Sequence, residues 1–78
     1  MPKQLVTESM LASIAAQQMR EQPGCRTCKL VEIDVTPLEW SLGMITEEGS
    51  NPSDINRGRI IVRRDMKLKY DLIRARAD

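Results

Sequence analysis

Apolar positions at helical spacing mark the first segment of the chain, residues 3–22. Leu11, Ala15 and Met19 share one face of a helical wheel, and Ala, Gln, Met and Leu are good helix formers. Pro23-Gly24 then ends the segment, because glycine is a common helix terminator. We therefore predict a helix over residues 3–22. Beside its main face lie Leu5, Ala16 and a second strip formed by Val6, Met10 and Ile14.

Alternating apolar and polar positions follow in residues 28–36 and 40–46. In the first run Val31, Ile33 and Val35 point one way and polar residues point the other, which is typical of a half-buried strand. Few residues separate the two runs, so we expect an antiparallel hairpin. We expect the tryptophan that opens the second run to be buried beneath the helices. The residues predicted to share its side of that run are Trp40, Leu42, Met44 and Thr46.

The longest element is predicted to be a helix from Asn51 to Arg76. Asn51 is suited to the N-cap, and Pro52 falls at the first helical position, where its missing N–H costs nothing. Two neighbouring apolar strips follow at helical spacing, and such a wide apolar face predicts two packing partners. One strip consists of Ile55, Val62, Met66 and Ile73, and the other of Ile61, Leu68 and Leu72.

A short strand at residues 59–63 is the alternative for part of this element. This run is β-branched and follows the turn-like Asn56-Arg57-Gly58, and a glycine inside a helix costs about 1 kcal/mol relative to alanine. We favour one continuous helix, because most apolar positions from Ile55 to Ile73 keep helical spacing.

The predicted order is α-β-β-α, which gives an α+β fold with two helices packed on a two-stranded antiparallel hairpin. At 78 residues the chain is one domain, residues 1–78, with a thin core. A two-stranded sheet is marginal by itself and leaves both edges open. An edge could pair with a second copy, so a homodimer and a monomer are both open at this point.

Composition argues against catalysis and membrane insertion. The chain contains no histidine and no glycine-rich phosphate loop, so we expect neither an enzyme nor a bound cofactor. No segment approaches the roughly 18 consecutive apolar residues of a membrane span. The first residues do not form the apolar stretch of a signal peptide, and we expect a cytoplasmic location.

Cys25-Arg26-Thr27-Cys28 is the one constellation with candidate chemistry. Two cysteines at this spacing form half of a zinc site, but a third cysteine and any histidine are missing from the chain. A redox role is also disfavoured, because thioredoxin-like motifs place the first cysteine at a helix N-terminus after a strand, and here the order is reversed. We interpret Cys25 and Cys28 as small apolar residues at a helix–strand junction.

Charge is unevenly distributed along the chain. Residues 55–78 hold eight Lys/Arg and three Asp/Glu, whereas residues 1–54 hold four and eight. A basic helix face is either a solvated surface that balances an acidic body or a surface that contacts phosphates of nucleic acid. The candidate phosphate contacts are Arg57, Arg59, Arg63, Arg64, Lys67 and Arg74.

Several short motifs resemble a group of small alphaproteobacterial proteins of the rhizobial type, which has no assigned function. The motifs are Pro23-Gly24-Cys25, Val31-Glu32-Ile33, Trp40 after a strand, and Tyr70-Asp71-Leu72, within residues 22–73. The resemblance implies an α-β-β-α fold and a bacterial cytoplasmic protein, and it implies no site residues. The second cysteine departs from the pattern of that group.

These observations lead to three functional hypotheses. The first is a non-enzymatic interaction module, which would present the hairpin edge or the spare apolar strips to a protein partner or to a second copy. The second is a nucleic-acid-binding protein that uses the basic helix face. The third is a thiol or metal site at Cys25 and Cys28.

Overall fold

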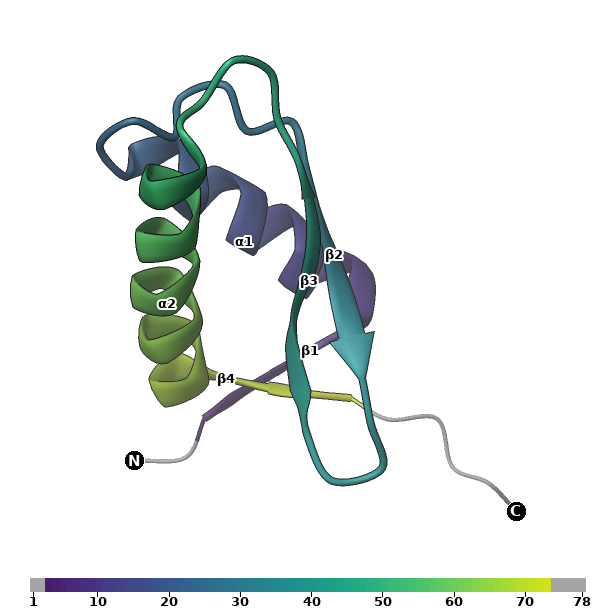
Figure 1. The fold of residues 1–78 in the computed structure, drawn as a ribbon. Helices are drawn as coiled ribbons and strands as arrows, with labels where there is room; N and C mark the ends of the chain where they lie inside the picture. Colours follow the sequence, from purple (N-terminus) through teal and green to yellow (C-terminus); the bar gives the residue numbers. More distant parts are fainter. Residues whose placement is uncertain (1–2, 74–78) are drawn as a thin grey trace.

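The computed structural model describes residues 3–73, and these fold into two helices and two small sheets (Figure 1). The predicted α+β fold, with two helices and an antiparallel hairpin, is confirmed. A parallel pair of short strands, Gln4–Val6 and Tyr70–Leu72, is added to it. The elements in chain order are β1 (Gln4–Val6), α1 (Glu8–Glu21), β2 (Leu30–Val35), β3 (Trp40–Thr46), α2 (Pro52–Lys69) and β4 (Tyr70–Leu72).

The first helix begins later than predicted, because Gln4–Val6 form a strand. These residues pair in parallel with Tyr70–Leu72, and this pairing gives their backbone groups partners that a helix would otherwise supply. Thr7 then caps α1 through its side-chain oxygen, which accepts a hydrogen bond from the Met10 amide at 3.2 Å. The prediction of helix for residues 3–7 is therefore wrong.

The second helix ends at Lys69, earlier than the predicted Arg76. Tyr70 takes extended backbone angles, and its N–H closes the helix on the Met66 carbonyl. Tyr70-Asp71-Leu72 then belongs to β4 and not to a helix end. No glycine or proline marks this boundary in the sequence, and pairing with β1 accompanies the change in backbone. The last predicted helical residues, 74–76, lie outside the described part of the chain.

Between these ends α2 is continuous, so the alternative of a strand at residues 59–63 is wrong. Asn51 is the N-cap as predicted, with its side-chain oxygen 2.8 Å from the Ser53 amide. Gly58 is buried within the helix, and it permits close packing. A Cβ at this position would lie 3.1 Å from the sulfur of Cys25 and 3.2 Å from the terminal methyl of Met19 on α1.

The hairpin contains an irregularity that changes which residues face the core. Val31 pairs with Ile45, but Ile33 pairs with Leu42, so β3 contains one extra residue between these two pairs. Such a bulge turns the following side chains to the opposite face. Met44, predicted to share the side of Leu42, is 67 % exposed, while Ile45 packs against the core.

The core forms where α1 meets both α2 and the hairpin (Figure 1). Trp40 is 2 % exposed, so its predicted burial is confirmed. The described chain measures 43 × 26 × 17 Å, and its thinness leaves many large apolar side chains outside the core. Within residues 3–73 neither helix has the length and apolar character needed to cross a bilayer.

Candidate functional site

Cys25 and Cys28 lie in the loop between α1 and β2, and both are free and buried. The Cys25 amide donates to the Gln22 carbonyl at 3.1 Å, and the Cys28 amide donates to the Cys25 carbonyl at 3.2 Å. Arg20 of α1 fixes the end of this loop, because its Nε donates to the Cys28 carbonyl at 2.8 Å. Within residues 3–73, no group of three or more His, Cys, Asp or Glu side chains is placed to hold a metal ion.

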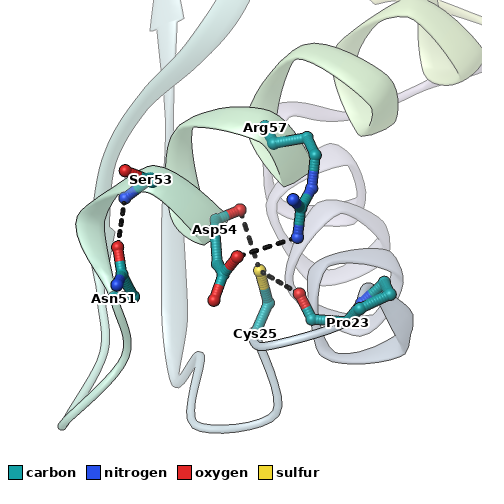
Figure 2. A network of polar contacts seen from close by, with 6 residues as sticks. All are labelled: Pro23, Cys25, Asn51, Ser53, Asp54 and Arg57. Carbon is teal, nitrogen blue, oxygen red and sulfur yellow. Dashed lines mark hydrogen bonds and ion pairs between the residues drawn. The ribbon is translucent and has the colours of Figure 1, made fainter.

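The thiol of Cys25 joins the loop to the first turn of α2 (Figure 2). Its sulfur lies 3.3 Å from the Asp54 carbonyl and 3.8 Å from the Pro23 carbonyl. The Asp54 carboxylate accepts a hydrogen bond from Arg57 at 2.8 Å. The same carboxylate lies where a side chain on Gly24 would be, since a Cβ there would come within 2.7 Å of the Asp54 carboxyl carbon.

Both thiols are held in the protonated form at neutral pH. Burial raises the pKa of Cys25, and the Asp54 carboxylate raises it further, while Arg57 acts in the opposite direction. Burial also raises the pKa of Cys28, against the effect of Arg20. A thiolate is the nucleophile and the metal ligand, so this environment disfavours both redox and metal chemistry at the loop.

Carboxylates of the same chain pair with three of the six predicted phosphate-binding residues. Arg57 binds Asp54, as described above. Glu39, in the hairpin turn, lies 3.6 Å from the Arg63 guanidinium and 4.0 Å from the Lys67 ammonium. These pairs reduce the positive charge that the helix face offers to a polyanion.

Lys67 is further tied to the hairpin by its position over the Trp40 ring, 4.5 Å from the ring centroid. Burial lowers the pKa of Lys67, and Glu39 opposes this effect by favouring the charged amine. Lys67 therefore anchors α2 on β3 and is not a free, fully solvated cation.

The three remaining candidates occupy different environments. Arg64 is exposed and has no ion-pair partner among residues 3–73. Arg59 is half-buried, and its Nε is buried without a hydrogen-bond partner in the same part of the chain. Arg74 lies outside the described residues. Within residues 3–73, the structure thus brings Arg63 and Lys67 together at Glu39.

The two apolar strips predicted for α2 differ in burial. Ile55, Val62 and Met66 are buried against the rest of the molecule. Ile61 and Leu68, which we call the outer strip, are 42 % and 73 % exposed. The other predicted members of the strips lie beyond the helix, where Leu72 is buried in β4 and Ile73 is exposed.

Glu39 and Arg20 are the site residues that the sequence did not reveal. Glu39 precedes Trp40 in a connecting turn, and only the packing of the hairpin on α2 brings it to Arg63. Arg20 looks like any basic residue in the last turn of a helix, and its bond to the Cys28 carbonyl depends on the path of the following loop.

Comparison with protein-family models, with curated proteins and with solved structures finds no match to this chain.

Proposed function

We propose that this protein is a non-enzymatic self-association module in which the outer strip of α2 packs against the same strip of a second copy. The observation that carries the proposal is the exposure of Ile61 and Leu68 on a helix whose neighbouring apolar strip is buried. Burying a fully exposed aliphatic side chain contributes about 1.5–3 kcal/mol, and a symmetric pair of strips would bury the exposed parts of four such side chains. α2 runs along one side of the fold, where a second copy has access to it (Figure 1).

Charge supports a second copy as the partner and also selects its orientation. On a wheel with about 100° per residue, Arg64 lies on one side of the outer strip and Asp65 on the other. Asp65 also pairs with Lys69 of its own helix at 3.1 Å. A twofold axis parallel to α2 would bring Arg64 of each copy to Asp65 of its partner at nearly the same height. An antiparallel arrangement would instead bring like charges together. The proposed dimer therefore has its two α2 helices parallel.

Sedimentation equilibrium over a wide concentration range tests this proposal. We expect a monomer–dimer equilibrium that Leu68→Glu weakens at least tenfold, because a carboxylate would be buried without a partner. Leu38→Glu is the matched control, since Leu38 is 94 % exposed in the hairpin turn and its substitution leaves dimerisation unchanged. A wild-type chain that stays monomeric at all concentrations would overturn the proposal.

A charge exchange tests the orientation separately. Arg64→Asp places four carboxylates at the rim of the parallel dimer and weakens it. Adding Asp65→Lys to that variant restores opposite charges across the interface and recovers most of the affinity. An exposed ion pair contributes only about 0.2–1 kcal/mol, so the apolar strip dominates and the dimer depends weakly on salt. If the double variant is no tighter than Arg64→Asp, the helices are not parallel.

Nucleic-acid binding by the basic face is the alternative, and the pairing of Arg57, Arg63 and Lys67 with carboxylates weighs against it. Fluorescence anisotropy of labelled DNA and RNA at about 50 and 200 mM salt distinguishes the two. About six phosphate contacts would make affinity fall roughly 10³-fold between these salt concentrations. Such a steep dependence, abolished by Arg63→Glu with Arg64→Glu, would favour this alternative.

A further inference from the structure

A groove runs between the first turns of α1 and the outer side of β2. Its volume is about 460 Å³, and the residues that line it are Glu8, Ser9, Ala12 and residues 30–34. A face of a strand exposes every second residue, whereas this groove is lined by five consecutive residues of β2. The groove therefore follows the edge of the strand.

This edge of β2 has no neighbouring strand within residues 3–73, because the sheet consists of β2 and β3 alone. The Thr36 amide donates to the Glu39 carbonyl at 2.8 Å, so Thr36 directs its backbone groups toward the β3 side. Backbone direction alternates along a strand. Ile33 and Val35 therefore direct their N–H and C=O groups toward the open edge, where an added strand would meet them.

Two carboxylates give the groove its charge. Glu8 and Glu32 line it, and neither has an ion-pair partner in the described part of the chain. Asp34 also lines the groove, but its carboxylate leans over Gly43, where a Cβ would come within 2.8 Å of the carboxyl carbon. No basic residue is among the lining residues. The groove is thus complementary to a cationic ligand.

The floor of the groove limits the size of inward-pointing side chains. Ala12 of α1 and Ile33 of β2, which is 9 % exposed, form this apolar floor, and Val31 is fully buried. In an added strand, alternate side chains would point to this floor and the others would point to the side of Glu32. The first set must be small, and the second set gains from positive charge.

We propose that the open edge of β2 binds an extended peptide of a partner protein in which basic residues alternate with small ones. The backbone of the peptide adds a strand to the hairpin, and its Lys or Arg side chains approach Glu32 and Glu8. Five residues at about 3.3 Å each match the length of the lined edge. This site lies on β2, away from the outer strip of α2, and the inference stands independently of self-association.

A second copy of β2 is a poor occupant of the same edge. Pairing two β2 edges would bring Glu32 and Asp34 of one copy close to those of the other, and like charges opposite one another destabilise a sheet. Acidic residues on an exposed edge protect natural sheets against such pairing. The same residues favour a cationic strand.

Titration of the 78-residue chain with an acetylated and amidated Lys-Ala-Lys-Ala-Lys peptide tests the proposal, with backbone amide NMR shifts as the readout. We expect the largest shifts at residues 30–35 and saturable binding. Glu32→Lys weakens binding at least tenfold, whereas Glu21→Lys, the same change at an exposed site outside the groove, leaves it unchanged. Absence of saturable shifts at β2, or equal binding by both variants, would overturn the proposal.

N-methylated peptides separate strand addition from simple charge attraction. Alternate N–H groups of an added strand point toward β2. Of two peptides methylated at odd or at even positions, one loses binding and the other retains it. Equal binding by both peptides would mean that no strand is added, and the proposal would fail.

The chain also contains its own alternation of basic and small residues, Arg74-Ala75-Arg76-Ala77. We expect the variant Arg74→Ala with Arg76→Ala to bind the peptide with unchanged affinity. If this variant binds the peptide at least tenfold more tightly, the chain's own sequence competes for the groove. The proposal of a separate partner peptide would then be overturned.

Discussion

Two glycines adopt positive φ angles, but the space that a side chain would need is occupied beside only one of them. Gly24 has φ of 79° and Gly49 has φ of 82°. The Asp54 carboxylate occupies the space beside Gly24, whereas nothing lies within 4 Å of the corresponding position at Gly49. Gly24 therefore serves both the turn and the contact between the cysteine loop and α2, and Gly49 serves only its turn.

This difference predicts unequal costs for the same substitution. Gly49→Ala lowers the free energy of unfolding by about 1 kcal/mol, the cost of left-handed backbone for an L-residue. Gly24→Ala lowers it by at least about 1 kcal/mol more, because the new methyl group displaces Asp54. Urea unfolding followed by Trp40 fluorescence measures both. Equal losses would show that Asp54 moves aside without cost.

At the scale of the element, β1 and β4 show how pairing overrides helical spacing. Val6 falls at a helical position two turns before Ile14, yet it lies in β1 and is 1 % exposed. Its neighbour Leu5, predicted to flank the main face of a helix, is 63 % exposed. A strand places successive side chains on opposite sides, and this explains the contrast.

We therefore expect opposite consequences from truncating these two neighbours. Val6→Ala lowers the free energy of unfolding by about 2 kcal/mol, because it leaves a cavity in the core. Leu5→Ala changes it by less than about 0.5 kcal/mol, as for most exposed positions. Thermal and urea unfolding compare the two variants with the wild type. A larger loss for Leu5→Ala would contradict the β1 strand.

For the whole molecule, the buried thiols link folding to pH. Cys25 and Cys28 become accessible when the core opens, and burial raises the pKa of each above the ordinary value of 9.0. Between the unfolded and the folded pKa, the unfolded state has lost protons that the folded state keeps. The free energy of unfolding therefore falls as pH rises past about 9.

The lowered pKa of Lys67 acts with the opposite sign, because the unfolded state then keeps the proton longer. A comparison between the wild type and Cys25→Ala with Cys28→Ala removes this contribution, since both proteins retain Lys67. Under reducing conditions, urea unfolding between pH 7 and 10 gives a steeper decline for the wild type. Parallel pH profiles would show that the thiols do not contribute.

The sequence by itself determined the features that depend on neighbours along the chain. Alternation located the hairpin, with β3 at residues 40–46, and the cap at Asn51 located the start of α2. Helical spacing identified Ile55, Val62 and Met66 as core residues, and the burial of Trp40 was expected from its place at the start of the second alternating run. These features arise from local backbone preferences and side-chain periodicity, which any short window of sequence contains.

The tertiary structure alone decided the features that join distant residues. Three such features have no local signal in the sequence. They are the β1–β4 pair, the bulge that turns Ile45 and not Met44 toward the core, and the contact of Glu39 with Arg63. Gly58 looked like a helix breaker, but it is the point at which α2 approaches α1 and the cysteine loop. Packing supplies free energy that outweighs a local preference of about 1 kcal/mol, and only the assembled fold shows where it does so.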